Sequence, residues 1–279
     1  MVLVLGAGCN QVLGLSSTQV IDAGFYDAQI DAPFACPPTG TGMPPRFSRL
    51  LHQVVVQPVF EYTTSSATMR AVAQSPSGVV EGPIDDVMTP ATGLGGSPAC
   101  LACAQLVFPR LTPEGDGVYG VLSSMFGAHL ALYRRAANEW MEVQAFGTPL
   151  GSFLSSVTRG PTRHLMIYDG VAFHEYAVDD GGGSTEVLPA YQPGDLGLFN
   201  LGNPMFTADG LRMVFPGTVV RDGTTTTEMY YADRPDLAAR FTTATALVDV
   251  PVVDSAYLTE DCSRIYISGL GSLFYAQRL

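Results

Sequence analysis

The chain has 279 residues, of which 47% are hydrophobic and 14% are charged, and its formal net charge is −12 at pH 7. This acidic balance excludes a nucleic-acid ligand, because phosphates require a positive binding surface. The 30 glycines and 20 prolines separate short apolar runs, and no stretch of any length has helical periodicity. These features predict one all-β domain that is large enough to bury a full core.

The first nine residues resemble the end of a bacterial lipoprotein signal. An apolar run leads into Leu5-Gly6-Ala7-Gly8-Cys9, although no basic segment stands before the run and Gly6 occupies a position where leucine is usual. The resemblance implies that Cys9 is the residue that is cleaved at and lipidated. We therefore expect residues 1–9 to be a signal remnant and the protein to be membrane-anchored, in the periplasm or at the cell surface. Another form of export and a cytosolic protein are the alternatives.

Residues 10–43 are expected to form a flexible tether. Asp-Ala pairs recur there with little apolar periodicity, and a segment rich in proline, glycine and threonine follows at residues 37–42. Such a composition buries too little apolar surface to fold alone. The spaced aspartates lack the Asp-x-Asp-x-Asp-Gly pattern of a calcium loop, so we predict no metal site in this segment.

The remainder of the sequence, residues 44–279, contains five related units. In each unit a threonine closes a short apolar run and a turn follows. Four of the units are marked by threonines that lie 46, 49 and 52 residues apart, and a weaker copy lies 48 residues earlier: Thr64, Thr112, Thr158, Thr207 and Thr259. A period of 40 to 50 residues, built from short strands and turns, is typical of a β-propeller.

Four strands are predicted in each unit. Asp-Gly and Glu-Gly pairs after the threonine favour a tight turn into a second strand, because glycine accepts positive φ. That second strand opens with an arginine in three units, at Arg163, Arg212 and Arg264. A third run follows, and a fourth is visible at Glu139–Val143 and Thr243–Val248. The pattern predicts a five-bladed β-propeller of four-stranded antiparallel blades.

The fifth unit ends after its third strand, which leaves that blade without an outer strand. Unpaired strand edges invite aggregation, so a further segment is needed to cover this edge. The β-like segment at Phe47–Val55 belongs to no unit. We therefore expect this N-terminal strand to pair with the last strand and to close the ring.

Two units resemble the TolB-type propeller repeat, which reads roughly Pro-x-Phe-Ser-x-Asp-Gly-x-x-Leu-x-Phe-x-Ser. The matching segments are Pro204–Phe215 and Tyr257–Ser268, with Cys262 where glycine is usual. The Tyr-Ala-Asp-Arg and Tyr-Ala-Gln-Arg segments at Tyr231–Arg234 and Tyr275–Arg278 resemble the third strand of a subgroup found in bacterial lipoproteins. The resemblance implies an extracytoplasmic location and protein interaction, and it implies no catalytic residues.

With Cys9 as the anchor, the other four cysteines permit three pairings. Cys36 lies just before the predicted closing strand, and Cys262 lies in the first turn of the blade that this strand completes. We therefore expect a Cys36–Cys262 disulfide that clamps the ring, and a local disulfide between Cys100 and Cys103. A redox motif and half of a zinc site are the alternatives for the local pair. Its Gly/Pro-rich surroundings provide neither a helix N-terminus nor a second set of ligands.

Motifs of catalysis and cofactor binding are sparse. The sequence has no Gly-x-Ser-x-Gly elbow, His-Glu-x-x-His motif or Walker loop. Residues 115–120 read Gly-x-Gly-x-x-Gly, but they fall in a predicted strand turn and open no helix, so they do not predict a dinucleotide site. The four histidines show no ligand spacing: His52, His129, His164 and His174. We expect no cofactor and no metal.

The axial channel carries the enzymatic alternative, because five-bladed propellers include glycosidases that set carboxylates around it. The candidate channel-facing residues are Glu61, Arg110, Asn203 and Asp254, and further carboxylates from loops or turns are Asp85, Asp86 and Asp169. Two carboxylates that converge on the channel within roughly 5 to 10 Å would favour catalysis. An ordinary propeller also has polar residues at its channel.

These observations together predict a non-enzymatic protein- or glycan-binding or scaffold module. A propeller face offers a broad, rigid set of loops, which suits recognition. The expected partner is a protein or glycan of the cell envelope, and the expected membrane contact is the lipid anchor. The alternative function is a propeller glycosidase or lyase that acts on polysaccharide through channel carboxylates.

Overall fold

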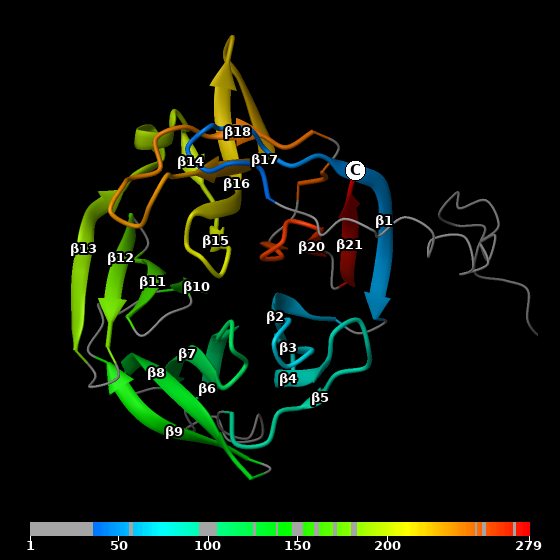
Figure 1. Cartoon of the computed structure of the whole chain (residues 1–279), viewed down its shortest axis with the longest axis vertical. Coiled ribbons are helices and arrows are strands. Elements are labelled where there is room, and N and C mark those ends of the chain that lie inside the picture. The colour runs from blue at the N-terminus through cyan, green and yellow to red at the C-terminus, as the bar shows by residue number, and fades with distance from the viewer. Residues whose placement is uncertain are drawn as a thin grey trace, which may run out of the picture. The chain divides into compact units, whose positions relative to one another are not determined.

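Five antiparallel sheets form a ring in the computed structural model of the chain (Figure 1). The structure describes residues 36–55, 58–94, 105–124, 127–137, 139–146, 153–158, 162–169, 172–179, 183–248, 250–252, 255–269 and 272–279. These residues contain no α-helix, only a 3-10 turn, η2 (Pro193–Leu196). The prediction of a five-bladed propeller is confirmed. The predicted signal remnant with Cys9, most of the tether, and the Cys100–Cys103 pair lie outside the described residues.

Three blades follow one another in sequence with an identical strand order. The first strand lies nearest the axis and the fourth lies at the rim (Figure 1). Blade 1 contains β2 (Phe60–Ser65), β3 (Arg70–Ser75), β4 (Gly78–Pro83) and β5 (Thr89–Pro90). Blade 2 contains β6 (Gln105–Leu111), β7 (Gly117–Ser124), β8 (Gly127–Ala136) and β9 (Glu139–Phe146). Blade 3 contains β10 (Phe153–Val157), β11 (Arg163–Tyr168), β12 (Phe173–Val178) and β13 (Ser184–Tyr191).

Blade 4 differs from the others at its inner edge and in the length of its central hairpin. Its inner edge has two short strands that both pair with β16. Its elements are β14 (Asn200–Leu201), β15 (Met205–Phe206), β16 (Arg212–Arg221), β17 (Thr224–Asp233) and β18 (Thr245–Ala246). Because β16 and β17 have ten residues each, their hairpin extends beyond the rim of the ring (Figure 1).

Blade 5 joins the two ends of the described chain. It contains β19 (Ser255–Leu258), β20 (Arg264–Gly269), β21 (Ser272–Arg278) and, as its outer strand, β1 (Phe47–Val55). The register of β1 against β21 runs antiparallel from Phe47 opposite Arg278 to Val55 opposite Leu273. The expectation that the N-terminal strand closes the ring is therefore confirmed.

The segment just before β1 lies on the ring. Cys36 forms a disulfide with Cys262, with a Cα–Cα distance of 5.1 Å. Arg212 donates a hydrogen bond to the Pro37 carbonyl at 2.7 Å, and the Gly42 N–H donates to Asp233 Oδ1 at 3.1 Å. Residues 36–43, which we assigned to the tether, thus contact blades 4 and 5.

The repeated threonine ends the inner strand and begins a turn. In blade 4 the Thr207 hydroxyl donates to Asp209 Oδ1 at 2.5 Å, and the Gly210 N–H donates to the Thr207 carbonyl at 2.8 Å. Gly210 has a φ of 70°, and Cys262, three residues after Thr259, has a φ of 57°. The turn requires this left-handed conformation, so glycine is the usual residue there.

In blade 1 the turn residue is Ser65, one residue after the predicted Thr64. The register of β2 against β3 shifts between Phe60 and Thr63, and Glu61 has a φ of 52°. Blade 2 has the same bulge at Phe108, four residues before Thr112. Arg70 follows Ser65 by five residues, as Arg212 follows Thr207.

The core lies in the interfaces between neighbouring blades. Each blade presents alternating apolar side chains to the next blade, as antiparallel strands with two buried faces do. The interface between blades 4 and 5, for example, buries Val214, Tyr231, Ile265 and Ile267, each with no accessible surface, together with Phe47 of β1. The closing strand therefore contributes to the core as well as to the hydrogen-bonded edge.

Candidate functional site

Three of the four predicted channel residues meet in one polar cluster. Asn203 Nδ2 donates to both carboxylate oxygens of Glu61 at 3.2 Å, and Arg110 forms an ion pair with the same carboxylate. Glu61 belongs to blade 1, Arg110 to blade 2, and Asn203 to blade 4. Blades 1 and 4 are not neighbours in the ring, so the Glu61–Asn203 contact crosses the axial channel. The fourth candidate, Asp254, lies outside the described residues.

A small cavity lies beside Arg110, one member of the channel cluster. The cavity lined by Arg110, Thr63, Met205 and Tyr257 measures about 10 Å³, which is room for one water molecule at most. Arg110 is 1% exposed. Burial lowers the pKa of the Arg110 guanidinium, and the Glu61 carboxylate opposes that change. Among the described residues, the cluster contains one carboxylate, that of Glu61, and Arg110 neutralises its charge.

A cleft of about 450 Å³ opens beside the channel, between blade 1 and blade 5. It lies where the inner strands of these blades end, and it is lined mainly by residues of β19 and β20, of the end of β2, of the turns after β2 and β19 and of the loop after β4. Pro113 of blade 2 and Ala208 of blade 4 also line it. Its polar lining residues are Thr64, Ser65, Ser66, Asp85, Tyr257, Thr259, Glu260, Asp261, Ser263, Arg264 and Tyr266. A volume of this size is typical of a small-ligand or peptide side-chain site.

One wall of the cleft is held by a fixed polar group. The Tyr266 hydroxyl donates to Asp85 Oδ1 at 2.9 Å, and Arg264 forms an ion pair with the other carboxylate oxygen of Asp85. Arg264 also lies over the Tyr275 ring, 4.7 Å from its centroid. Burial raises the pKa of Tyr266, and the nearby Asp85 charge adds to this effect, so the hydroxyl remains a neutral donor. These contacts fix the positions of the Asp85 and Arg264 side chains.

The opposite wall carries two acidic residues of the blade 5 turn. Asp261 Oδ1 accepts hydrogen bonds from the Thr259 hydroxyl at 2.8 Å and from the Ser263 N–H at 3.0 Å. Burial acts to raise the pKa of Asp261, but these hydrogen bonds outweigh it and hold that pKa below its usual value. Ser66 of blade 1 donates to Glu260 Oε2 of blade 5 at 3.5 Å, across the interface of these two blades. Three carboxylates against one guanidinium make the cleft negative.

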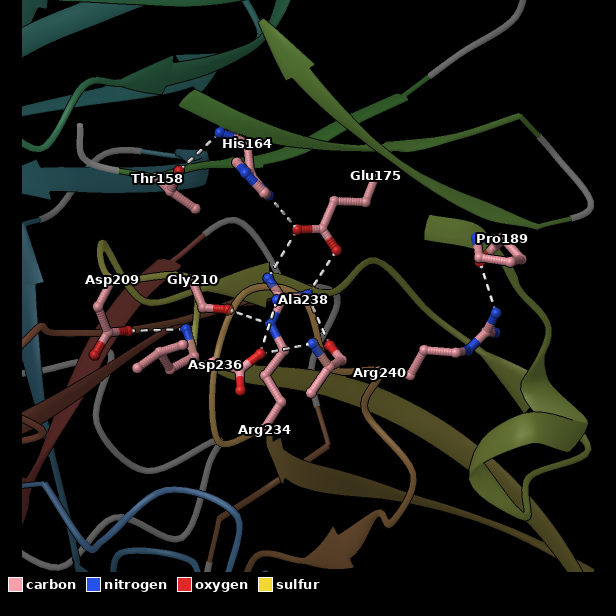
Figure 2. A network of polar contacts seen from close by, with 12 residues as sticks. Thr158, His164, Glu175, Pro189, Asp209, Gly210, Arg234, Asp236, Ala238 and Arg240 are labelled. Carbon is pink, nitrogen blue, oxygen red and sulfur yellow. Dashed lines mark hydrogen bonds and ion pairs between the residues drawn. The ribbon is translucent and has the colours of Figure 1, made fainter. Parts of the chain in front are cut away.

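A second polar network lies at the interface of blades 3 and 4 (Figure 2). Arg234 donates from two nitrogens to the two oxygens of Glu175, at 2.7 and 2.8 Å, and both side chains are fully buried. His164 Nδ1 lies 2.7 Å from Glu175 Oε1. The guanidinium stacks between the rings of Phe206 and Phe241, at 5.5 and 4.7 Å. Both oxygens of this carboxylate have partners inside the protein, so the network joins the two blades.

The interface of blades 1 and 2 uses the same chemistry. Glu81 Oε2 accepts from Arg70 at 2.8 Å within its own blade, and from Arg135 at 2.7 Å and Trp140 at 3.2 Å in the next blade. Arg135 and Arg234 occupy equivalent positions in their blades. Arg135 follows Arg134, which pairs with the first residue of β7, and Arg234 follows Asp233, which pairs with the first residue of β16.

The remaining predicted carboxylates lie apart from the channel. Asp85 lines the cleft, and Asp86 accepts a hydrogen bond from the Val87 N–H at 2.7 Å in the adjacent turn. Asp169 accepts from the Ala172 N–H at 2.8 Å and lies 3.1 Å from His174 Nε2 in blade 3. The sequence identified Asp85, but Glu260, Asp261 and Arg264 were recognised only as repeat positions. Their cleft forms where the first and last blades meet, and no local sequence pattern relates Asp85 to these residues.

Comparisons with known proteins place the chain by fold alone. No family model and no curated protein matches the sequence. Among solved structures, TolB from Acinetobacter baumannii is similar, with 8% identity and a TM-score of 0.45 over 79% of this chain and 54% of that chain. The chain thus spans about half the length of TolB.

Two further solved structures have the same general likeness. A protein of unknown function from Desulfotomaculum acetoxidans has 13% identity and a TM-score of 0.45 over 77% of this chain and 64% of that chain. An α-L-arabinofuranosidase from Podospora anserina has 11% identity and a TM-score of 0.42 over 89% and 95%. TolB, after which the expected repeat type is named, is thus among the solved structures with the same general fold.

Two features are absent from the residues that the structure describes. This part of the chain has no apolar helix of membrane-spanning length. It also has no group of three or more His, Cys, Asp or Glu side chains placed to hold a metal ion.

Proposed function

We propose that the protein is an exported, lipid-anchored propeller that acts as a non-enzymatic binding module, and that its ligand site is the cleft between blades 1 and 5. The observation that carries the proposal is the contrast between the two candidate sites. In the channel cluster the Glu61 carboxylate is held by Arg110 and Asn203, and the cavity beside Arg110 measures about 10 Å³, whereas the cleft offers about 450 Å³ and a polar wall.

The chemistry of the cleft favours a ligand with hydroxyl or cationic groups. Asp85 and Arg264 are held by each other and by Tyr266, so they present fixed acceptors and donors with little loss of side-chain entropy on binding. The Ser65, Ser66 and Thr259 hydroxyls add adaptable hydrogen-bonding groups. Protein segments with basic or hydroxyl side chains and glycans both have this chemistry. The cell envelope supplies both.

The enzymatic alternative, a polysaccharide hydrolase or lyase, has weaker support. Its mechanism requires one carboxyl group that gives a proton and a second that accepts one or attacks. Asp85 is occupied by Arg264 and Tyr266, and Glu61 is occupied by Arg110 and Asn203. Neither carboxylate is placed to act as a free base.

The cleft is tested with labelled protein on a glycan array and on an array of envelope-protein peptides. Ser66→Trp fills the cleft with an indole, and Ser184→Trp places the same side chain on the exposed rim strand β13 as a matched control. We expect hits of the parent protein to lose at least tenfold in signal with Ser66→Trp and to persist with Ser184→Trp. Equal binding by both variants would contradict the cleft as the site, and release of new reducing ends from a bound glycan would establish the enzymatic alternative.

The anchor is tested independently of the ligand. The gene is expressed with its upstream sequence in a bacterial host that processes lipoproteins, and the cells are labelled with a fatty-acid analogue. We expect label on the parent protein and none on Cys9→Ala. Label on Cys9→Ala at the parent level would show that Cys9 is not the lipidated residue, and it would leave the ligand site unaffected.

A further inference from the structure

The β16–β17 hairpin of blade 4 has an outer half that no other strand covers among the described residues. The two strands pair over ten positions, from Arg212 opposite Asp233 to Arg221 opposite Thr224. At the base, β14 pairs with Gly217 and Thr218, and β18 pairs with Tyr230 and Tyr231. We call the residues beyond these contacts, 219–228, the arm. Figure 1 shows the arm projecting outward from the ring.

The outer edge of β17 within the arm has free backbone groups. The Leu247 N–H donates to the Met229 carbonyl, and the Arg234 N–H donates to the Leu211 carbonyl beside β16. Even-numbered residues of β17 therefore bond to β16 and odd-numbered residues face outward, because backbone groups alternate along a strand. Thr225 and Thr227 face outward, and residues 224–227 are all exposed.

This edge lacks the features by which proteins prevent edge pairing. Natural edge strands carry lysine, proline or a bulge. Residues 224–228 read Thr-Thr-Thr-Thr-Glu, and their register against β16 is regular. Threonine has high strand propensity, and paired threonines on neighbouring strands stabilise a sheet.

We propose that two copies of the chain associate through this edge, β17 against β17, antiparallel about a two-fold axis at Thr226. The outward groups of Thr225 in one copy then meet those of Thr227 in the other, and the symmetry repeats the pair. Each such pair exchanges two backbone hydrogen bonds. The product is a four-stranded sheet that crosses the dimer.

Charge selects this arrangement. In the antiparallel register, Glu228 of one copy lies opposite Thr224 of the other, and Thr224 pairs with Arg221 in its own hairpin. Glu228 and the second copy's Arg221 are thus two strands apart in one row, about 9.6 Å between backbones, which these long side chains can span. The two-fold axis forms this ion pair twice. A parallel in-register arrangement would instead bring Glu228 against Glu228.

The association is expected to be weak, because five residues per copy bury less than a standard interface. Sedimentation velocity from about 10 μM to about 1 mM should show a monomer–dimer equilibrium. Thr225→Pro removes an outward N–H without removing a bond to β16, so it should abolish the dimer, whereas Thr225→Ser should retain it. Thermal unfolding of each variant confirms that blade 4 is intact.

A charge exchange tests the register. Glu228→Arg alone should shift the equilibrium toward monomer by about tenfold or more, and Glu228→Arg with Arg221→Glu should restore it, because the pair is re-formed with its signs exchanged. A parent protein that stays monomeric at about 1 mM, a dimer that survives Thr225→Pro, or an exchanged double variant that fails to recover would each overturn the proposal.

Discussion

Glu175, at the interface between blades 3 and 4, is buried and yet negatively charged. Glu175 and Arg234 are both fully buried. Arg234 donates one hydrogen bond to each oxygen of the Glu175 carboxylate, and His164 forms a further hydrogen bond with one of these oxygens. Burial acts to raise the pKa of Glu175, but the hydrogen bonds from His164 and Arg234 outweigh it and lower that pKa. The carboxylate is therefore charged in the folded protein, and its partners cannot be removed without leaving a charge in the core.

Arg234→Met should destabilise the protein by about 3 to 5 kcal/mol, because it leaves the Glu175 carboxylate buried and unpaired. Urea unfolding measures the loss. The double variant Arg234→Met with Glu175→Leu should recover a large part of the stability, since no buried charge is left. Asp195→Asn breaks the partly exposed Arg240 pair instead and should cost less than about 1 kcal/mol. Equal losses in Arg234→Met and Asp195→Asn would contradict this account.

His174 makes a pH-dependent contribution of the opposite sign to that of a carboxylate. Its ring lies 2.9 Å from Glu186 and 3.1 Å from Asp169. Burial acts to lower the pKa of His174, but the hydrogen bonds to Glu186 and Asp169 outweigh it and raise that pKa above 6.5. Its stabilisation is therefore complete below the unfolded value and is lost as pH rises through the folded value.

The difference in melting temperature between the parent and His174→Asn should accordingly be largest below about pH 6.5 and should shrink toward pH 9. Thermal unfolding at unit pH intervals measures it. His129→Asn serves as the control. A difference that grows with pH would mean that His174 is neutral in the folded protein.

The turn after each inner strand is the element in which sequence and backbone conformation are most tightly linked. Gly210 has a φ of 70°, and a Cβ there would lie 2.7 Å from the Thr158 methyl and 2.8 Å from Leu237. Gly197 has a φ of 72° and open space around it, and Gly194 has open space without a positive φ. A side chain at Gly194 would meet neither backbone strain nor a neighbour, one at Gly197 would meet backbone strain alone, and one at Gly210 would meet both.

Alanine at these three positions should give a graded series. Gly194→Ala should be neutral or slightly stabilising, Gly197→Ala should cost about 1 to 2 kcal/mol from the left-handed backbone, and Gly210→Ala should cost more because two neighbouring side chains must also move. Urea unfolding of the three variants gives the order. A Gly210→Ala variant no less stable than Gly197→Ala would show that blades 3 and 4 yield at their contact.

Regular elements of the blades were predictable because their signals are local. The positions of Thr112, Thr158, Thr207 and Thr259 gave the ends of the inner strands, since a hydroxyl that begins a turn must follow the strand directly. The offset at Ser65 was not predictable, because Thr63, Thr64 and Ser65 are consecutive hydroxyl residues and the pattern does not say which of them begins the turn. The added strand β14 was also missed, since a two-residue strand carries no periodicity.

The candidate sites also differ in how far the sequence predicts them. Glu61, Arg110 and Asn203 could be proposed because each is a polar residue on or just before the end of an inner strand, two to four residues before a repeated threonine. The cleft could not, because Asp85 and Arg264 are brought together by ring closure, and no local pattern relates them. Arg234 belongs to the Tyr-Ala-Asp-Arg segment that is recognisable in the sequence. Its partner Glu175 lies in a different unit, on β12 of blade 3, so the repeat pattern does not connect the two residues.

At the scale of the whole molecule, the ring depends on one interface that differs from the others. Blade 5 is completed by β1, and the Cys36–Cys262 disulfide fixes the segment before β1 to the turn before β20. The crosslink restrains the unfolded chain over a separation of 226 residues. Such a bond is worth roughly 2 to 5 kcal/mol.

Cys36→Ala should therefore lower the free energy of unfolding by roughly 2 to 5 kcal/mol, and the loss should be local at first. Hydrogen exchange should accelerate in residues 47–55 and 272–278 before it changes in residues 163–178 of blade 3, because β1 and β21 then pair without a covalent restraint. Exchange that accelerates uniformly around the ring would contradict closure as the weakest interface.

The positions of β1 and β21 near the two ends of the chain also determine how long β1 remains unpaired during synthesis. The ribosome makes Cys36 first and reaches Cys262 only 226 residues later. At about 5 to 20 residues per second, that interval lasts roughly 10 to 45 s. Blades 1 to 4 can form during this time, but β1 has no partner until the last residues are made. Each nascent chain thus carries an unpaired apolar strand for many seconds, and a premature stop that removes β21 alone leaves every copy open.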